Sequence, residues 1–148
     1  MTKREGLGPL EAINQIIRDN RVDDYASPNR ELGMQPIAFS KGASEWRWEQ
    51  QPAATLNPFG LVQGGYLAVF IDELLATAVA SVLGQGEWAV TAETKLSYIR
   101  AVKPSEVLGQ GRVLRRSAHL AFLEAEIRTE DGRTAVFATS TWSIAGSE

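Results

Sequence analysis

The stretch Asn57–Leu83, NPFGLVQGGYLAVFIDELLATAVASVL, decides the fold of this chain. From Gly65 onward it is apolar at almost every position, which predicts one long helix over Gly65–Leu83. Asp72 and Glu73 stand side by side near its middle. Two adjacent carboxylates would cost several kcal/mol at the centre of a bilayer, so we interpret this segment as a buried core helix rather than a membrane span.

The segments on either side of this helix predict strands and one further helix. Residues 9–20 have apolar positions at helical spacing, and residues 35–50 alternate as in a β-hairpin with a turn at Ser40–Gly42. After Gly84 and Gly86, four segments of strand length follow, and an "EDGR" turn joins the last two. This order has too few crossovers for a doubly wound parallel sheet. We therefore predict an α+β fold in which one antiparallel sheet wraps around the long helix.

Length, charge and composition exclude several classes of function. The 148 residues suit one domain spanning residues 1–148, and 22 % of them are charged. A net charge of −3 argues against a nucleic-acid partner. The chain has no cysteine, which excludes disulfides and thiolate chemistry, and its N-terminus has no apolar segment typical of a secretion signal. We expect a cytoplasmic protein without a membrane partner.

Familiar catalytic and cofactor motifs are missing or lie in the wrong context. The sequence GQGEWA resembles a dinucleotide-binding fingerprint, but it follows a predicted helix and opens a predicted strand, which is the reverse of the required order. The chain has no G-x-S-x-G elbow. His119 is the only histidine, so a multi-histidine metal site is excluded, and we interpret it as a solvated residue at a strand end.

The two carboxylates in the helix need a partner or a chemical role. An unpaired buried carboxylate costs several kcal/mol or has a raised pKa. For each of them one interpretation is structural, as a cap of nearby backbone or one half of an ion pair across an oligomer interface. The other is a functional acid. The structural interpretation suits Glu73 better, whereas small neighbours such as Ala68 and Ala76 leave space around Asp72.

The sequence Gln63-Gly64-Gly65 just before the helix adds a second chemical element. The first N–H groups of a helix have no partner within it and lie at the positive end of its dipole, so they can stabilise a developing oxyanion. Gly64 and Asp72 of one chain are about 12 Å apart at the helical rise per residue, which is too far for both to act on one carbonyl. A site that uses both would combine Gly64 of one subunit with Asp72 of another, which predicts a dimer with shared sites.

The stretch N-P-x-G-x-x-Q-G-G, with Asp72 nine residues after Gln63, resembles the acyl-CoA thioesterases of the phenylacetyl-CoA and 4-hydroxybenzoyl-CoA type. The resemblance extends over about residues 30–144, and it implies the hotdog fold, a homodimer or a dimer-of-dimers tetramer, and hydrolysis of acyl-CoA without a cofactor or a metal. It implies that the Gly64 N–H polarises the thioester carbonyl and that Asp72 of the partner subunit is the general base or the nucleophile. The remaining residues that it implies are Asn57, Gln63 and Thr91 for catalysis, and Gly65, Tyr98, Arg115, Arg116 and Ser117 for contacts with substrate and coenzyme A.

Gln63 departs from the family, which more often has histidine at this position. A glutamine amide can still donate a hydrogen bond, but it cannot ionise. The departure leaves open a second function, a non-catalytic module that binds acyl-CoA on the same fold. A hydratase or dehydratase is a third alternative, but it requires a histidine in the pocket, and His119 lies outside the motif.

Overall fold

A computed structural model describes residues 8–146 and confirms the predicted α+β architecture. A short helix, α1 (Pro9–Arg18), is followed by the 3-10 turns η1 (Val22–Asp24) and η2 (Pro28–Leu32) and by the hairpin of β1 (Met34–Ser40) and β2 (Ala43–Trp48). After the 3-10 turn η3 (Ala53–Thr55) comes the long helix α2 (Gly64–Ala80). The remaining strands are β3 (Glu87–Tyr98), β4 (Val107–Arg116), β5 (Leu120–Arg128) and β6 (Thr134–Gly146).

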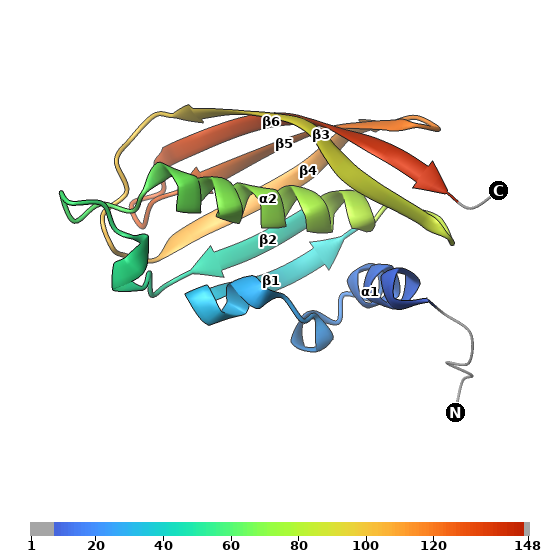
Figure 1. Cartoon of the computed structure of the whole chain (residues 1–148), viewed down its shortest axis with the longest axis horizontal. Coiled ribbons are helices and arrows are strands. Elements are labelled where there is room, and N and C mark those ends of the chain that lie inside the picture. Colours follow the sequence, from blue (N-terminus) through green and yellow to red (C-terminus); the bar gives the residue numbers. More distant parts are fainter. Residues whose placement is uncertain (1–7, 147–148) are drawn as a thin grey trace.

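The strands form one antiparallel sheet in the order β1-β2-β4-β5-β6-β3 within the described residues. The sheet curves around α2, with β1 and β2 on one side of the helix and β3 and β6 on the other (Figure 1). Buried side chains of α2, including Phe70, Leu74 and Ala78, face inward-pointing side chains such as Trp46 and Leu123. This enclosure explains why the helix is apolar around most of its circumference.

Close approach between α2 and the sheet depends on a glycine in β4. A Cβ atom on Gly111 would overlap the backbone oxygen of Leu74, so no larger residue fits there. The Ser44 hydroxyl donates to the same oxygen at 2.6 Å. Gly111 therefore serves helix–sheet packing.

Helix α2 begins at Gly64, one residue before the predicted start, and the C-terminal ends of both helices differ from the prediction. Helix α2 ends at Ala80 instead of Leu83, because the N–H groups of Val82 and Leu83 bond the carbonyls of Val79 and Ala80 in tighter, 3-10-type turns. Helix α1 ends at Arg18 instead of Asn20. Asn20 takes a left-handed conformation with φ of 53°, and its side-chain oxygen accepts the N–H of Phe39. No helix in the described part of the chain combines the length and apolar character needed to cross a membrane.

Candidate active site

The start of α2 is held by the loop that precedes it. Gln63 is the N-cap in an extended conformation, its N–H donates to the carbonyl of Thr55 at 2.8 Å, and its carbonyl accepts the N–H groups of Tyr66 and Leu67. Among residues 8–146, the N–H groups of Gly64 and Gly65 have no acceptor. The predicted pair of free donors at the positive end of the helix dipole is therefore present.

A cavity of about 260 Å³ adjoins these donors. Asn57, Gly64 and Tyr98 line it together, as do Ile99 and Arg100. The Tyr98 hydroxyl donates to the carbonyl of Gly64 at 2.9 Å, which fixes the end of β3 against the start of α2. Three residues predicted for the site are thus adjacent within one protomer.

Asn57 shapes the turn that borders this cavity. Its side-chain oxygen accepts the N–H groups of Phe59 at 3.0 Å and Leu61 at 3.1 Å. This oxygen is therefore committed to the turn, and the amide NH₂ is the part of Asn57 that is able to contact a ligand. Gln63 is exposed, and its side chain forms no hydrogen bond within the described residues.

Asp72 and Thr91 form the second half of the candidate site. The Thr91 hydroxyl donates to the Asp72 carboxylate at 3.3 Å, from the edge strand β3 to the middle of α2. Asp72 is exposed on one side, but protein atoms surround the carboxyl on the others. This desolvation raises the pKa of Asp72 above its ordinary value, and the hydrogen bond from Thr91 lowers it by a smaller amount.

The neighbouring carboxylate, Glu73, has a structural environment. It is buried, and one of its oxygens accepts hydrogen bonds of 2.6 Å from both the Ser27 hydroxyl and the Asn29 amide. The Tyr25 hydroxyl lies 3.5 Å from the other oxygen, and burial, together with the charge of Glu73, raises the pKa of that phenol. Glu73 therefore anchors the segment between α1 and β1 to α2. Its role is structural, but through side-chain hydrogen bonds within one protomer rather than through the backbone cap or the intersubunit ion pair that the sequence suggested.

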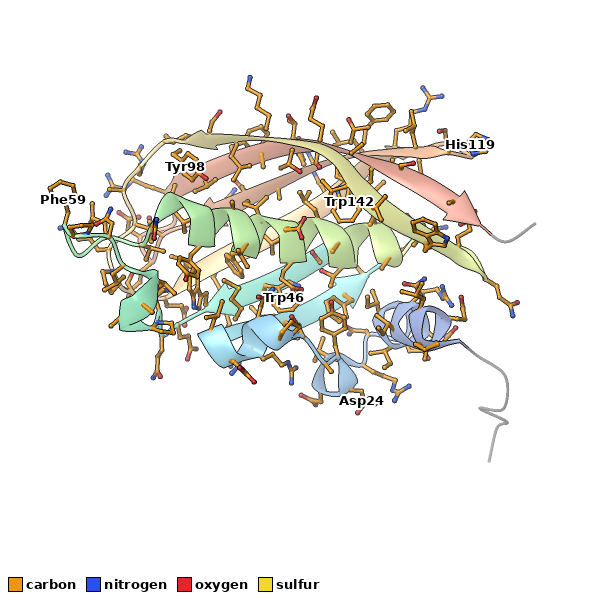
Figure 2. The ribbon with its side chains drawn as sticks, in the orientation of Figure 1. Asp24, Trp46, Phe59, Tyr98, His119 and Trp142 are labelled. Carbon is orange, nitrogen blue, oxygen red and sulfur yellow. The ribbon has the colours of Figure 1, made fainter. Side chains whose placement is uncertain are left out.

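The Arg115–Ser117 segment lies far from Gly64 within one protomer. Arg116 pairs with Glu87, which follows the C-terminal end of α2. Figure 2 places His119, in the same β4–β5 turn, at the opposite end of the sheet from Tyr98. A contact between this segment and a ligand at Gly64 thus requires a second subunit. His119 is exposed at a strand end, as predicted.

One protomer therefore carries two partial sites. Gly64, Asn57 and Tyr98 meet at the start of α2, whereas Asp72 and Thr91 meet two turns further along the helix. Arg100 also lines the first cavity, although the motif around Gln63 does not predict it. Its position directly after β3, in a stretch that already carried predicted site residues, is the one signal that pointed to it. Within residues 8–146, no group of three or more acidic or histidine side chains is placed to hold a metal.

Comparison with known proteins identifies the family. A family model for the thioesterase superfamily matches residues 59–136, more than half of the chain and the part that contains the start of α2, Asp72, Thr91 and Tyr98. The chain belongs to the thioesterase superfamily. The family resemblance drawn from the motif around Gln63 is thus confirmed, and family membership supports thioester hydrolysis as the general activity.

Solved structures place this thioesterase-superfamily chain among hotdog proteins. A conserved protein of Pseudomonas aeruginosa is 29 % identical, with a TM-score of 0.75, over 81 % of this chain and 94 % of its own. The PaaI protein of the Escherichia coli phenylacetic acid degradation operon has a TM-score of 0.78 at 18 % identity, over 93 % and 96 %. A Streptococcus mutans protein bound to acetyl CoA has a TM-score of 0.70 at 21 % identity, over 78 % and 90 %. The predicted hotdog fold is confirmed.

Proposed function

We propose that this protein hydrolyses acyl-CoA thioesters to the free acid and coenzyme A. The observation that carries the proposal is the pair of partial sites: free N–H donors at Gly64 and Gly65, and a partly desolvated carboxylate, Asp72, that accepts a hydrogen bond from Thr91. Family membership supports the reaction type. The similar fold of a Streptococcus mutans protein that binds acetyl CoA supports coenzyme A as the leaving group.

The start of α2 supplies the oxyanion site. The N–H of Gly64 points from a helix end whose dipole favours negative charge, so it stabilises the oxygen of the thioester carbonyl as a nucleophile adds to the carbon. Tyr98 bonds the carbonyl of the same residue and keeps this turn in place. Removing a single donor of this kind typically costs a factor of about 10²–10³ in kcat.

Asp72 supplies the base. As a general base, the carboxylate takes a proton from a water molecule while the water oxygen bonds to the thioester carbon. The C–S bond then breaks, and coenzyme A leaves as a thiolate that takes up a proton. As a nucleophile, Asp72 would itself bond to the carbon, expel the thiolate and form an anhydride that water hydrolyses. Thr91 orients the carboxylate in both cases.

A dimer through β3 would join the two partial sites. This strand lies at an edge of the sheet and is 12 residues long, so its outer backbone groups are available to a second strand. An antiparallel pair with its two-fold axis at Lys95 sets Thr91 of one chain opposite Tyr98 of the other, because the bulge between Thr91 and Glu93 takes up one residue. Thr91 is hydrogen-bonded to Asp72, and Tyr98 is hydrogen-bonded to Gly64. This register therefore brings Asp72 of one subunit toward the start of α2 in its partner.

The test is release of free thiol from a panel of short, long and aryl acyl-CoAs. Turnover that depends on Asp72 supports the proposal, and the panel also identifies the preferred acyl group. If no member of the panel releases thiol at acyl-CoA concentrations that saturate the protein, the proposed hydrolase activity is contradicted.

A non-catalytic acyl-CoA-binding module is the second candidate. Gln63 favours it, because an amide at the position where the family more often has histidine cannot exchange a proton. The same panel separates the two functions, since this candidate predicts binding of acyl-CoA with no thiol released.

A further inference from the structure

Phe59 is the most exposed large apolar side chain in the described part of the chain, with 86 % of its surface accessible. It lies at the tip of the turn between Asn57 and Leu61, at one end of the molecule (Figure 2). The Asn57 side-chain oxygen accepts the N–H groups of Phe59 and Leu61, and the Asn57 N–H donates to the carbonyl of Leu61 at 2.8 Å. These bonds keep the turn in place with the ring in solvent. Exposed aromatic side chains on a fixed backbone are typical of protein interfaces.

The helix α1 also leaves apolar side chains uncovered. Leu10 and Ile13, one turn apart, are 58 % and 40 % exposed, whereas Asn14 and Ile17 are buried against the rest of the fold. The protomer therefore covers one side of α1 and leaves a second apolar surface, formed by Leu10 and Ile13, open to solvent.

Hydrogen bonds place this helix beside the first residue of β3. The Asn14 amide donates to the carbonyl of Glu87 at 3.1 Å, and Arg18 donates to the carbonyl of Leu83 at 3.0 Å. Helix α1 thus lies where α2 ends and β3 begins, at the opposite end of the molecule from Phe59 (Figure 1 and Figure 2). Within one protomer the exposed ring and the exposed surface of α1 cannot meet.

A dimer through β3 would bring these two ends together. With Thr91 of one chain opposite Tyr98 of the other, the residues that follow Tyr98 run alongside the first residues of the partner's β3, where α1 lies. The turn that carries Phe59 stays next to this segment, because the N–H of Val62 donates to the carbonyl of Val102 at 2.9 Å. The exposed ring of one subunit therefore reaches α1 of the other.

We propose that Phe59 of each subunit docks on the surface formed by Leu10 and Ile13 on α1 of the partner subunit. The inference rests on the proposed function, because it takes the two subunits to be joined through β3. The contact removes an aromatic ring and two aliphatic side chains from water, and two-fold symmetry makes it twice per dimer. Because Asn57 and Gly64 line one cavity, a docked Phe59 also fixes that cavity against the partner subunit.

Cross-linking tests the contact directly, because the chain has no cysteine of its own. The double variant Phe59→Cys/Ile13→Cys is treated with a short bismaleimide and run on a denaturing gel. The matched control is Phe59→Cys/Ile37→Cys, since Ile37 is 41 % exposed, as Ile13 is, but lies on β1 at the other edge of the sheet. We expect a covalent dimer from the first pair and only monomer from the control pair and from each single cysteine variant.

The dissociation constant of the dimer, measured by sedimentation of a dilution series, gives a second test. We expect Phe59→Ala to raise it about tenfold or more, because a buried aromatic anchor is lost twice, whereas Ile37→Ala leaves it unchanged. Ile13→Ala also raises it, but Phe59→Ala/Ile13→Ala raises it by less than the product of the two single effects, because the two side chains share one contact. An unchanged constant in Phe59→Ala, or no covalent dimer from the Phe59/Ile13 pair, overturns the inference.

The outcomes separate this inference from the proposed function. A wild-type dimer that hydrolyses acyl-CoA, with no covalent link formed in the Phe59→Cys/Ile13→Cys variant, contradicts the inference alone. A variant that is linked through these two positions, in a protein that releases no thiol from any acyl-CoA, contradicts the hydrolase alone. A wild-type protein that sediments as a monomer contradicts both the inference and the shared site.

Discussion

The Thr91 hydroxyl donates a hydrogen bond of 3.3 Å to the Asp72 carboxylate and links the edge strand β3 to the middle of α2. It is the one side-chain hydrogen bond that Asp72 forms within residues 8–146. The adjacent Glu73 instead accepts two short hydrogen bonds from an anchored loop. Two carboxylates that are neighbours in sequence thus have different environments because they point to different sides of the helix.

Exchanging each carboxylate for its amide tests this difference. We expect Asp72→Asn to lower kcat by a factor of about 10² or more, because an amide cannot act as base or nucleophile. Glu73→Gln keeps an oxygen for Ser27 and Asn29 and should retain near-wild-type turnover. Steady-state kinetics with one acyl-CoA checks both variants. Near-full turnover of Asp72→Asn would remove Asp72 from the mechanism.

Removal of Glu73's acceptor oxygens should affect stability and not chemistry. Glu73→Ala leaves the buried groups of Ser27 and Asn29 without their acceptor, so we expect the free energy of unfolding to fall by about 2–4 kcal/mol. Urea denaturation of Glu73→Ala and Glu73→Gln measures this cost, with the smaller effect expected for the amide. Equal stability of Glu73→Ala and the wild type would show that the network does not anchor the segment.

The pH dependence of turnover reports the environment of Asp72. The carboxylate must be deprotonated to act, so kcat/KM falls as the pH is lowered through the pKa of Asp72. Because desolvation raises that pKa, the acid limb should lie above the ordinary aspartate value. The hydrogen bond from Thr91 lowers the pKa, so Thr91→Val should move the limb to still higher pH, whereas Thr91→Ser should restore it. A limb that does not move in Thr91→Val contradicts this coupling.

The raised pKa of Asp72 should also lower the stability of the folded protein at neutral pH. A folded-state pKa above the unfolded value means that the folded protein binds the proton more tightly, so this group disfavours folding once the pH rises through both values. Asp72→Asn removes that cost. We therefore expect its melting temperature at pH 7 to be no lower than that of the wild type, with the difference shrinking in acid. A large loss of stability at pH 7 would mean that Asp72 has a structural partner.

Two substitutions at Gly64 separate the N–H donor from the space around it. A Cβ atom at this position would lie 3.3 Å from the ring of Tyr98, so Gly64→Ala and Gly64→Pro both add the same contact. Only proline removes the N–H, and proline is well tolerated at the first position of a helix after an extended residue such as Gln63. We expect Gly64→Pro to lose about 10²–10³ in kcat, and Gly64→Ala to lose much less. Equal losses would show that the donor is not used.

The sequence was sufficient to predict the order of elements and the family because the signals are local. The unbroken apolar run of α2, the alternation around Trp46 and Trp48, and the motif from Asn57 to Asp72 each depend on residues close in the chain. The different environments of Asp72 and Glu73 were also predictable from helix geometry. The ends of α1 and α2 were less so, because Asn20 and Val82 follow local hydrogen bonds that compete with the helical pattern.

Contacts between distant segments could not be read from the sequence. The network of Glu73 with Ser27 and Asn29 spans more than 40 residues, and the loop between α1 and β1 carries no pattern that predicts it. Arg100 lines the cavity at the start of α2, and only its place in the sequence beside predicted site residues pointed to it. The charge and spacing of residues in the sequence do not show which exposed basic side chain will border a cavity.

The central claim is that Asp72 of one subunit acts with Gly64 of its partner, and a mixed dimer tests it most directly. Asp72→Asn and Gly64→Pro chains with different affinity tags are co-expressed, and the heterodimer is purified by both tags. If the sites are shared, one of the two sites in the heterodimer retains both Asp72 and Gly64, and the other site has lost both. We predict about half of the wild-type thioesterase activity from a heterodimer whose two parent homodimers are inactive. A heterodimer as inactive as its parents would contradict the claim, because each chain would then depend on its own Asp72 and Gly64.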